Sequence, residues 1–218
     1  SDLRVEGSNP SGRTKKRDNM KVIKPFGPSI GKTKLKKTVI GRLNQFSDKV
    51  VKNKSLAKKY NYDHRLIGSM KQQFRIPKNI LKLGLESAIN KSIKDYYKKT
   101  LDIKVKKIRL ERAWIVSQYA GDFNPPHLHR GNISGVGYLK IPSSIKNNRE
   151  KDLAGLISFF DGRVSLPRNS PPLVKHRQTF KPIVGDFYIF PAFLMHDVHP
   201  FRGEGERRCF SFNAFVDA

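Results

Sequence analysis

The sequence is poor in cysteine and in long apolar runs, and each shortage excludes a class of protein. A single cysteine, Cys209, among 218 residues permits neither a disulfide framework nor a cysteine-rich zinc site. No stretch approaches the roughly 20 apolar residues of a membrane span. The longest apolar run, residues 187–195, is interrupted by Pro191. The N-terminus also lacks an apolar signal core. We therefore expect a cytoplasmic protein that does not enter a membrane.

Acidic residues are also scarce, because 18 Asp and Glu face 44 Lys and Arg, for a formal net charge of +26. Such a charge attracts nucleic acid, anionic surfaces and anionic small molecules, but it does not determine a fold. Lysine-rich chains can also reflect the base composition of a genome. The charge alone therefore makes a nucleic-acid partner a hypothesis that the rest of the sequence has to support.

The chain divides into three parts by composition. Residues 1–19 have no apolar periodicity and are rich in Ser, Gly, Lys and Arg. They are predicted to be a disordered basic tail, or an upstream artefact with Met20 as the natural start. Residues 20–102 are predicted to form a helical and mixed support region, and residues 103–218 a β-rich core. Hydrophobic residues make up 37% of the chain, enough for one compact core.

The support region gives one clear helix signal. Leu81, Leu85, Ile89, Ile93 and Tyr96 recur at a spacing of three to four, which predicts a helix over residues 78–99 that lies on a sheet with its lysines in water. Earlier, "MKVIKPFG" is typical of a short edge strand. The following "GPSIGKTKL" resembles a phosphate-binding loop, but it has three residues between its glycines where that motif requires four. We predict a flexible basic turn there.

The β-rich core is predicted from short segments of Val, Ile, Phe, Tyr and Trp separated by turns rich in Gly, Pro and Asn. The segments are residues 113–119, 134–141, 153–160, 186–190 and 207–215. This spacing is typical of an antiparallel β-sandwich or barrel.

Histidines provide the strongest chemical signal. Four of the six lie in two short segments, "NPPHLHRGN" and "FPAFLMHDVHPF". On an extended strand His127 and His129 point the same way, and imidazole is a good ligand for Fe, Zn, Ni and Cu. Together with His196 they predict a facial metal site. The competing interpretation is two surface histidines after a Pro-Pro turn.

Strand parity places polar residues on one face of two predicted strands. In "SGVGYLKI" Ser134 and Tyr138 share a face, and in "RRCFSFN" Arg207 and Cys209 share a face. That face is solvent in an ordinary strand, but it is the pocket in a barrel that holds a polar ligand. The residues alone do not choose between these two.

The order "YAGDFNPPHLH", "SGVGYLKIP", "GDFYIFPAFLMHDVHP" and "GERRCFSFN" resembles the 2-oxoglutarate/Fe(II) oxygenases, over residues 113–215. It is most similar to the prolyl-4-hydroxylase-like branch, whose uncharacterised members include many phage proteins. The resemblance implies a mainly β fold with added helices. The core would be a double-stranded β-helix, a jelly-roll or cupin-like fold, whose major sheet carries the N-terminal helical layer. Phe210, Phe212 and Ile141 would face that layer.

By the same resemblance, His127, His129 and His196 are the catalytic metal ligands. Arg207 would pair with the far carboxylate of 2-oxoglutarate, aided by Tyr138 and Ser134, and Tyr119 would line the near end of the cosubstrate. The implied cofactors are Fe(II), 2-oxoglutarate and O₂, with ascorbate as a candidate addition. The favoured substrate is a protein or peptide side chain such as proline, with nucleic acid as the alternative. Arg130, Asn132 and a lid formed by residues 167–181 are candidates for selecting it.

One residue departs from the family pattern. The family usually has a carboxylate where this sequence has His129, so the ligand set would be neutral and leave more positive charge on the metal. Asp122 or Asp197 could complete the shell instead, although neither has the usual spacing. His199 is predicted to lie beside the site rather than in it.

Two other classes of protein compete with an oxygenase. A cupin metalloenzyme would use the same fold, but its usual Glu after the His-x-His is missing from "RGNIS" and it needs no Arg207. A nucleic-acid-binding protein without catalysis would rely on the charge alone, with "KDYYKK" as its best local candidate. Dependence of activity on 2-oxoglutarate separates the first from an oxygenase. Salt-sensitive binding that survives loss of the histidines would indicate the second.

Overall fold

The computed structural model describes most of the chain from Met20 onward. The described residues are 20–24, 27–62, 68, 70, 72–146, 153–160 and 177–218. The predicted tail, residues 1–19, lies outside them, as do residues 167–176 of the predicted lid. In the described part, no helix is both long enough and apolar enough to span a membrane.

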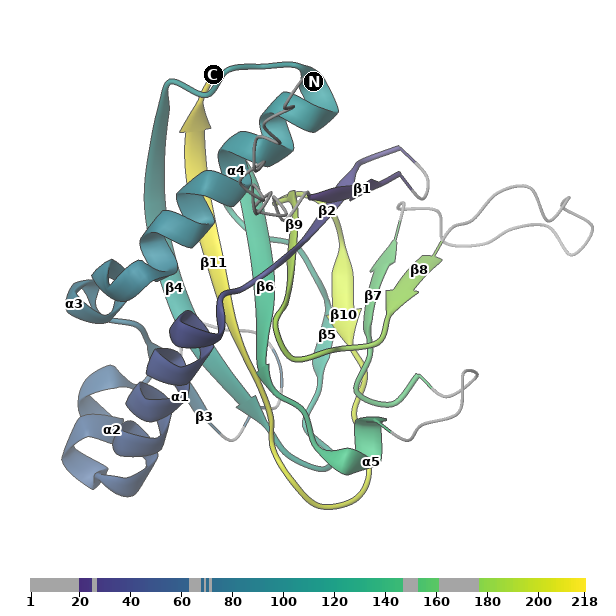
Figure 1. The fold of residues 1–218 in the computed structure, drawn as a ribbon. Coiled ribbons are helices and arrows are strands. Elements are labelled where there is room, and N and C mark those ends of the chain that lie inside the picture. The colour runs from purple at the N-terminus through teal and green to yellow at the C-terminus, as the bar shows by residue number, and fades with distance from the viewer. Residues whose placement is uncertain are drawn as a thin grey trace, which may run out of the picture.

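Two antiparallel sheets face each other and form the predicted double-stranded β-helix (Figure 1). The larger has seven strands in the order β1-β2-β9-β6-β11-β4-β3, and the smaller has four in the order β5-β10-β7-β8. The larger sheet contains β1 (Lys21–Ile23), β2 (Ile30–Lys34), β3 (Gln72–Arg75), β4 (Lys107–Gln118), β6 (Ile133–Lys140), β9 (Asp186–Pro191) and β11 (Arg207–Asp217). The smaller contains β5 (Asn124–His127), β7 (Ile157–Phe160), β8 (Arg177–Phe180) and β10 (His196–Val198).

Helices cover the outer face of the larger sheet (Figure 1). They are α1 (Lys37–Lys52), α2 (Lys54–Tyr60), α3 (Lys78–Ile80), a π-helical turn η2 (Leu81–Leu85) and α4 (Glu86–Leu101), while a short α5 (Ser143–Lys146) follows β6. The predicted helix over residues 78–99 is therefore present, with a kink at Gly84, whose φ of 113° suits glycine. Its predicted apolar face is buried, with Ile89 and Ile93 both 0% exposed.

Strand alternation separates two hydrophobic cores. Phe210 and Phe212 of β11 pack under the helices in the first core, as predicted. Tyr138 and Cys209 belong to the second core, between the sheets. Ile141 also belongs to this second core, so its predicted place under the helices is wrong. The chain leaves the parity of β6 after Lys140, where that strand ends.

The prediction of a flexible basic turn over the "GPSIGKTKL" segment is wrong, because residues 30–34 form β2. This strand pairs with the predicted edge strand β1 on one side and with β9 on the other. Lys32 and Lys34 both form ion pairs with Asp186, whose side chain is fully buried. A basic segment therefore becomes a strand here because a buried carboxylate neutralises its lysines.

An ion-pair network anchors the start of β11 to the helical layer. Arg208 donates to Glu206 at 2.7 Å and to Asp48 of α1 at 2.7 Å, and it also donates to the side chain of Asn44 at 3.0 Å. Because neighbouring strand residues point to opposite faces, this attachment of Arg208 directs Arg207 between the sheets.

The close contact between Gly135 of β6 and Phe212 of the neighbouring strand β11 gives a stability prediction. An added Cβ at Gly135 would lie against the ring of Phe212 and 2.7 Å from the backbone oxygen of Tyr188. Gly135→Ala should lower the free energy of unfolding by about 1–3 kcal/mol, because an overpacked core has to move backbone atoms. Urea unfolding followed by circular dichroism measures this change.

Gly41→Ala is the matched control, because Gly41 lies on the exposed side of α1 and its Cβ would meet nothing within 4 Å. That variant should be unchanged or more stable by up to about 1 kcal/mol. Equal stability of the two variants would show that β6 and β11 are not packed as described.

Candidate metal centre

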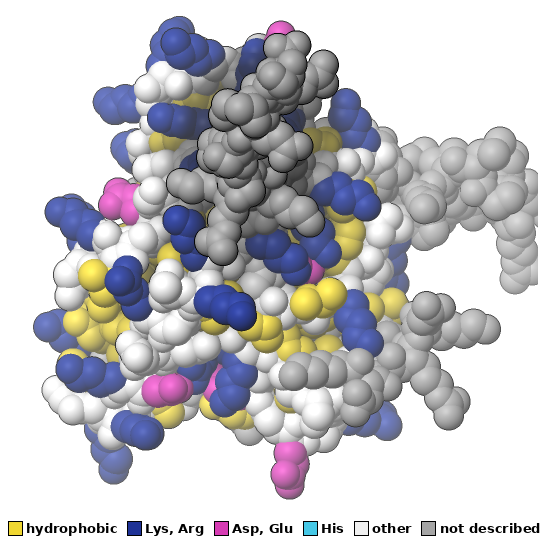
Figure 2. Space-filling model, in the orientation of Figure 1, with side chains coloured by type: hydrophobic (Ala, Val, Ile, Leu, Met, Phe, Trp, Pro, Cys, Tyr) yellow, Lys and Arg dark blue, Asp and Glu magenta, His cyan; other side chains and the backbone are white. Residues whose placement is uncertain are grey.

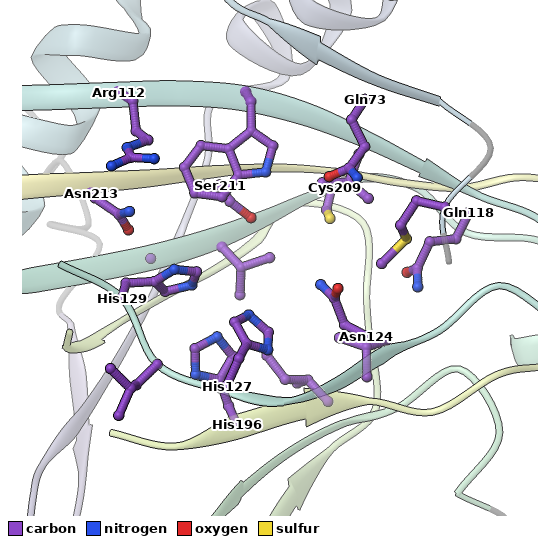
Figure 3. A pocket seen from close by; sticks show the side chains of 18 of the residues that line it. Gln73, Arg112, Gln118, Asn124, His127, His129, His196, Cys209, Ser211 and Asn213 are labelled. Carbon is purple, nitrogen blue, oxygen red and sulfur yellow. The ribbon is translucent and has the colours of Figure 1, made fainter. Parts of the chain in front are cut away.

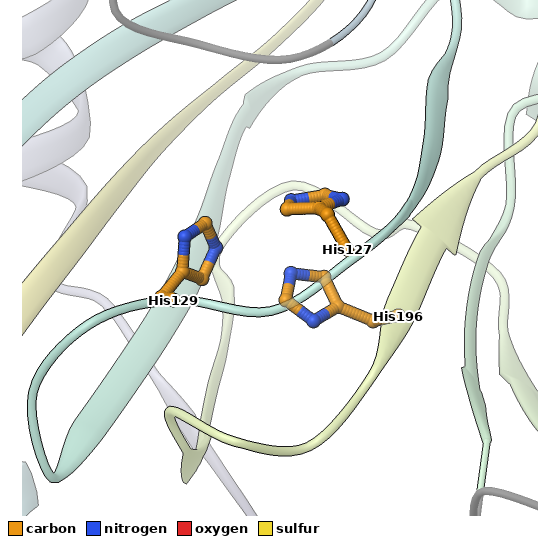
Figure 4. A group of neighbouring side chains, drawn as sticks. All are labelled: His127, His129 and His196. Carbon is orange, nitrogen blue, oxygen red and sulfur yellow. The ribbon is translucent and has the colours of Figure 1, made fainter.

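Strand pairing brings the three predicted histidines together (Figure 4). β10 runs antiparallel to β5, and His196 lies directly opposite His127 in their register. His129 lies two residues beyond His127, where the chain has left β5, and its backbone N–H donates to the oxygen of Ala192 at 2.9 Å. That bond keeps the segment after β5 beside the turn that leads into β10.

The three imidazoles form a compact cluster. Their ring centroids are 4.4 Å apart for His127 and His196, 4.9 Å for His127 and His129, and 5.0 Å for His129 and His196. One nitrogen from each ring lies within 4.8 Å of the other two. Small side-chain rotations can close such separations to the spacing of ligands on one ion, since metal–nitrogen bonds are about 2.0–2.1 Å long.

Backbone carbonyls determine which nitrogen two of these rings can offer. Nδ1 of His127 donates to the oxygen of Pro125 at 2.7 Å, and Nδ1 of His196 donates to the oxygen of Leu194 at 2.8 Å. Because a carbonyl only accepts, both Nδ1 atoms carry the proton and both Nε2 atoms have a lone pair. Metal-binding histidines commonly have this arrangement. The donor set therefore fits a metal that imidazole prefers, including iron.

Burial keeps the cluster uncharged. Burial lowers the pKa of His127, an effect that the hydrogen bond to Pro125 partly opposes. Burial lowers the pKa of His129 to about 3, assisted by the charges of His127 and Arg112. The pKa of His196 also falls well below its usual range because of burial and the two neighbouring histidines. Neutral imidazoles are the form that binds metal.

Aromatic rings provide much of this burial. The ring of Phe190 lies 4.9 Å from that of His196, and Phe159 lies 5.7 Å from it on another side. Trp114 of β4 lies 5.9 Å from His129. These rings exclude water from the side of the cluster that faces the core.

The other predicted candidates for the metal shell lie outside the cluster. His199 Nε2 contacts Ser158 at 3.3 Å and Asp197 at 3.4 Å, and it also meets Arg177. Asp122 accepts from the backbone N–H of Tyr119 at 3.0 Å. Among the described residues, the cluster contains three histidines and no carboxylate. The structure thus brings the three histidines together, while the other candidates lie outside their cluster.

A cavity of about 210 Å³ opens between the sheets beside the histidines (Figure 3). That volume equals roughly seven water molecules in the liquid, so it suits a small ligand. Described residues that line it include the three histidines, Arg112, Arg130, Arg207, Gln118 and Asn213. Figure 3 shows Arg112 and Asn213 at one end and Gln118 and Cys209 at the other.

Arg207 is a buried cation whose described partners are all neutral. It is 1% exposed. It donates to the oxygen of Gly155 at 3.1 Å, to Tyr138 at 3.5 Å and to the side-chain oxygen of Gln118. Burying a charge without an opposite charge costs several kcal/mol. An anion in the cavity would remove that cost, so the geometry suits Arg207 to hold a carboxylate.

Among the described residues Arg207 lines the cavity, whereas the other three predicted cosubstrate residues do not. Tyr138 is fully buried against Arg207, and burial raises the pKa of its hydroxyl, which stays a neutral donor. Ser134 donates to Asn213 at 2.7 Å. Tyr119 does not line the cavity in the described part of the chain. It lies near Glu206 and Arg208, and burial raises its pKa.

Sequence reasoning missed Gln118, the neighbour of Tyr119. Gln118 is 1% exposed and lines the cavity, and its side-chain nitrogen has no hydrogen-bond partner although its oxygen accepts from Arg207. The signal was strand parity, because Gln118 alternates with Trp114 and Val116, which also face the cavity. The prediction instead selected Tyr119, the next residue in the chain.

Comparison with known proteins agrees with this geometry. Residues 112–213 match the family model of 2OG-Fe(II) oxygenases, while no curated protein sequence matches the chain. A Pseudomonas putida prolyl-4-hydroxylase is 15% identical with a TM-score of 0.54, covering 91% of this chain and 92% of its own.

Two further solved structures show the same fold. A viral collagen prolyl hydroxylase from Paramecium bursaria Chlorella virus-1, in complex with 2-oxoglutarate, is 14% identical with a TM-score of 0.52, covering 87% of this chain and 96% of its own. A Trichoplax adhaerens prolyl hydroxylase in complex with a hypoxia inducible factor peptide is 14% identical with a TM-score of 0.54, covering 91% and 84%. At these identities the likeness establishes the fold.

The cluster predicts which substitutions remove metal. His127→Ala and His196→Ala should each weaken Fe(II) or Co(II) binding by at least about a hundredfold, since even residues that only orient a ligand cost 10–100-fold. An anaerobic titration monitored by calorimetry measures the affinity. His199→Ala is the matched control and should bind metal as the unchanged protein does. Loss of metal in that variant, with retention in His127→Ala, would place the metal elsewhere.

Proposed function

Because residues 112–213 match the family model of 2OG-Fe(II) oxygenases, we propose that this chain is such an oxygenase and that His127, His129 and His196 hold its iron. The enzyme is a non-haem dioxygenase that hydroxylates a C–H bond. Bound iron supplies, with 2-oxoglutarate and O₂, the oxidation that replaces a substrate hydrogen by a hydroxyl group. The observation that carries the ligand assignment is the buried cluster of three neutral imidazoles whose nitrogens lie within 4.8 Å of one another.

His129 takes the place at which the family usually has a carboxylate. Its imidazole adds no negative charge, so the chain itself compensates less of the metal's charge than a carboxylate would. The ring is held from two sides, by the bond from its backbone N–H to Ala192 and by the packing of Trp114. We assign it to the metal because no described carboxylate lies in the cluster.

Arg207, Gln118 and Tyr138 are the residues that we assign to the far carboxylate of 2-oxoglutarate. Arg207 supplies the positive charge and Tyr138 a neutral hydroxyl. The unpartnered nitrogen of Gln118 supplies a donor in the same part of the cavity. Gln118 also accepts from Arg207, so it positions the guanidinium and contacts the ligand. Ser134 is not assigned to this carboxylate, because its hydroxyl donates to Asn213 at the other end of the cavity (Figure 3).

The substrate we propose is a side chain of a protein or peptide, such as proline. Three of the similar structures are named as prolyl hydroxylases, and one of these holds a peptide. A peptide can present one side chain to the cavity while the rest of its length stays outside. A cavity of about 210 Å³ can hold such a side chain beside a small dicarboxylate, provided that the rest of the peptide stays outside.

Arg207→Ala should abolish turnover of 2-oxoglutarate to succinate, because the far carboxylate loses its charged partner. Succinate release measured with Fe(II), 2-oxoglutarate and O₂ tests this outcome, and Fe(II) titration of the same variant should show that metal binding persists. Normal turnover by the variant would refute the assignment of Arg207 and return a cupin-type metalloenzyme without 2-oxoglutarate to consideration.

Gln118→Leu should weaken 2-oxoglutarate binding by about ten- to a hundredfold, the range for one hydrogen bond to a charged group. The affinity can be measured by calorimetry with Co(II) in place of iron, so that turnover is not needed. Tyr119→Phe is the matched control, because it removes only a hydroxyl outside the cavity wall. A loss of affinity in Tyr119→Phe without one in Gln118→Leu would restore the prediction made from the sequence.

A further inference from the structure

The cavity has a second end, away from Arg207 and open to solvent. Arg112 and Asn213 lie at that end beside His129, while Gln118 lies at the other (Figure 3). Arg130 also lines the cavity, and it is exposed. A dicarboxylate that extends from the metal towards Arg207 leaves the open end for the substrate. Residues there can therefore select which substrate reaches the iron.

Regular alternation along β4 directs Arg112 into this end, since Trp114 and Val116 also face the cavity. A β-bulge at Glu111 ends that alternation. Asn213 of β11 pairs with Arg112, but the next residue, Ala214, pairs with Leu110, so Glu111 is an extra residue in β4. Bulges re-aim side chains and are common next to active sites. Leu110 packs against the core under the helices, whereas Arg112 faces the cavity.

Neighbouring groups hold the Arg112 side chain and leave it able to bind a ligand. Glu111 accepts from one terminal nitrogen at 2.9 Å, and the hydroxyl of Tyr62 lies 3.3 Å from the other. A guanidinium has five N–H donors, so these two contacts orient it without using all of them. The oxygen of Asn213 accepts from Ser134, so the remaining polar group of that side chain is a donor at the same end.

The charge of the cavity favours an anion. Its described lining contains Arg112, Arg130, Arg207 and three histidines, and neither Asp nor Glu. Where Arg207 pairs with the cosubstrate, Arg130 and Arg112 remain at the open end, and Glu111 occupies only one side of the Arg112 guanidinium. Lys and Arg far outnumber Asp and Glu on the face shown in Figure 2, and the net charge of +26 adds a long-range field of the same sign.

The rim also has apolar side chains that suit a peptide. Leu128 lines the cavity and is 57% exposed, and Phe193, outside the described lining, is 67% exposed. Both belong to the segments joined by the bond from His129 to Ala192. A bare phosphate group would gain nothing from these contacts, whereas a peptide with mixed acidic and apolar residues can use both.

We propose that the open end of the cavity selects acidic peptides, with a carboxylate of an Asp or Glu near the hydroxylated residue bound by Arg112. The inference rests on the proposed function, since the peptide must present its C–H bond to the same iron. In this proposal Arg112 determines substrate specificity. Its guanidinium donates two parallel hydrogen bonds to the carboxylate of the peptide.

Three short peptides that differ only in charge test the proposal on the unchanged protein. Each has one central proline, flanked on both sides by Glu, Gln or Lys. Affinity is measured by fluorescence anisotropy with labelled peptide and metal-free protein, and succinate release is measured with Fe(II) and 2-oxoglutarate. The Glu peptide should bind about ten- to a hundredfold more tightly than the Gln peptide, the range for a hydrogen-bonded charge. The Lys peptide should not bind, and the preference should shrink with added salt.

Arg112→Gln should lose most of the preference for Glu over Gln, and Arg112→Lys should retain part of it. Arg109→Gln is the matched control, because Arg109 is an exposed arginine of the same strand that stacks on Phe215 outside the described cavity lining. It removes the same charge and should keep the preference. A general effect of net charge would instead reduce the preference equally in Arg109→Gln and Arg112→Gln.

Equal binding of the three peptides would overturn the inference, as would stimulation of succinate release by an oligonucleotide but by none of the peptides. Neither result touches the proposed function if the protein still turns over 2-oxoglutarate. If the protein shows no 2-oxoglutarate turnover under any condition, the proposed function fails as well, and the two failures are thereby distinguished.

Discussion

The pairing of β10 with β5 is the constraint on which the site depends. It places His196 directly opposite His127, and the connection through Ala192 holds His129 against both. The histidines lie in segments of the chain that are almost seventy residues apart, so only the antiparallel register brings them together. Each ring is neutral because it is buried. The backbone carbonyls that fix two of the tautomers belong to Pro125 within β5 and to Leu194 just before β10.

The two faces of the larger sheet have different roles, because one packs the core under the helices and the other faces the site. One face of β6 and β11 packs Phe210 and Phe212 against glycines and helices, and the other face carries Arg207 into the cavity, with Tyr138 buried beside it. Adjacent residues of β11 show the division most clearly, since Arg208 is neutralised by acidic groups whereas Arg207 meets only neutral ones. The cavity therefore contains a cation whose burial costs several kcal/mol until an anion binds. The helical layer and its ion pairs supply the stability that permits this cost.

The sequence alone predicted those features of the fold and the site that depend on local patterns of residues. The helix over residues 78–99, the β-rich core and the shared direction of His127 and His129 all follow from periodicity and parity. Other features depend on partners that are distant in the chain. The strand at residues 30–34 requires the buried carboxylate of Asp186, and the role of Gln118 appears only when its nitrogen is seen to lack a partner. The bulge at Glu111 breaks the alternation on which a parity argument relies, so that Leu110 faces the helices although Arg112 faces the cavity. Helix α1 was not predicted, although its buried residues Val39, Leu43, Phe46 and Val50 recur at a spacing of three to four, so the same periodicity could have found it.

The most direct test of the account is whether iron and 2-oxoglutarate bind together at the three histidines. The measurement is an anaerobic titration of the metal-free protein with Fe(II) and 2-oxoglutarate, following the weak visible charge-transfer band that a keto acid chelated to Fe(II) produces. The account predicts a band that needs both components, is absent in His127→Ala and persists in His199→Ala. Metal binding without any band that depends on 2-oxoglutarate would contradict it.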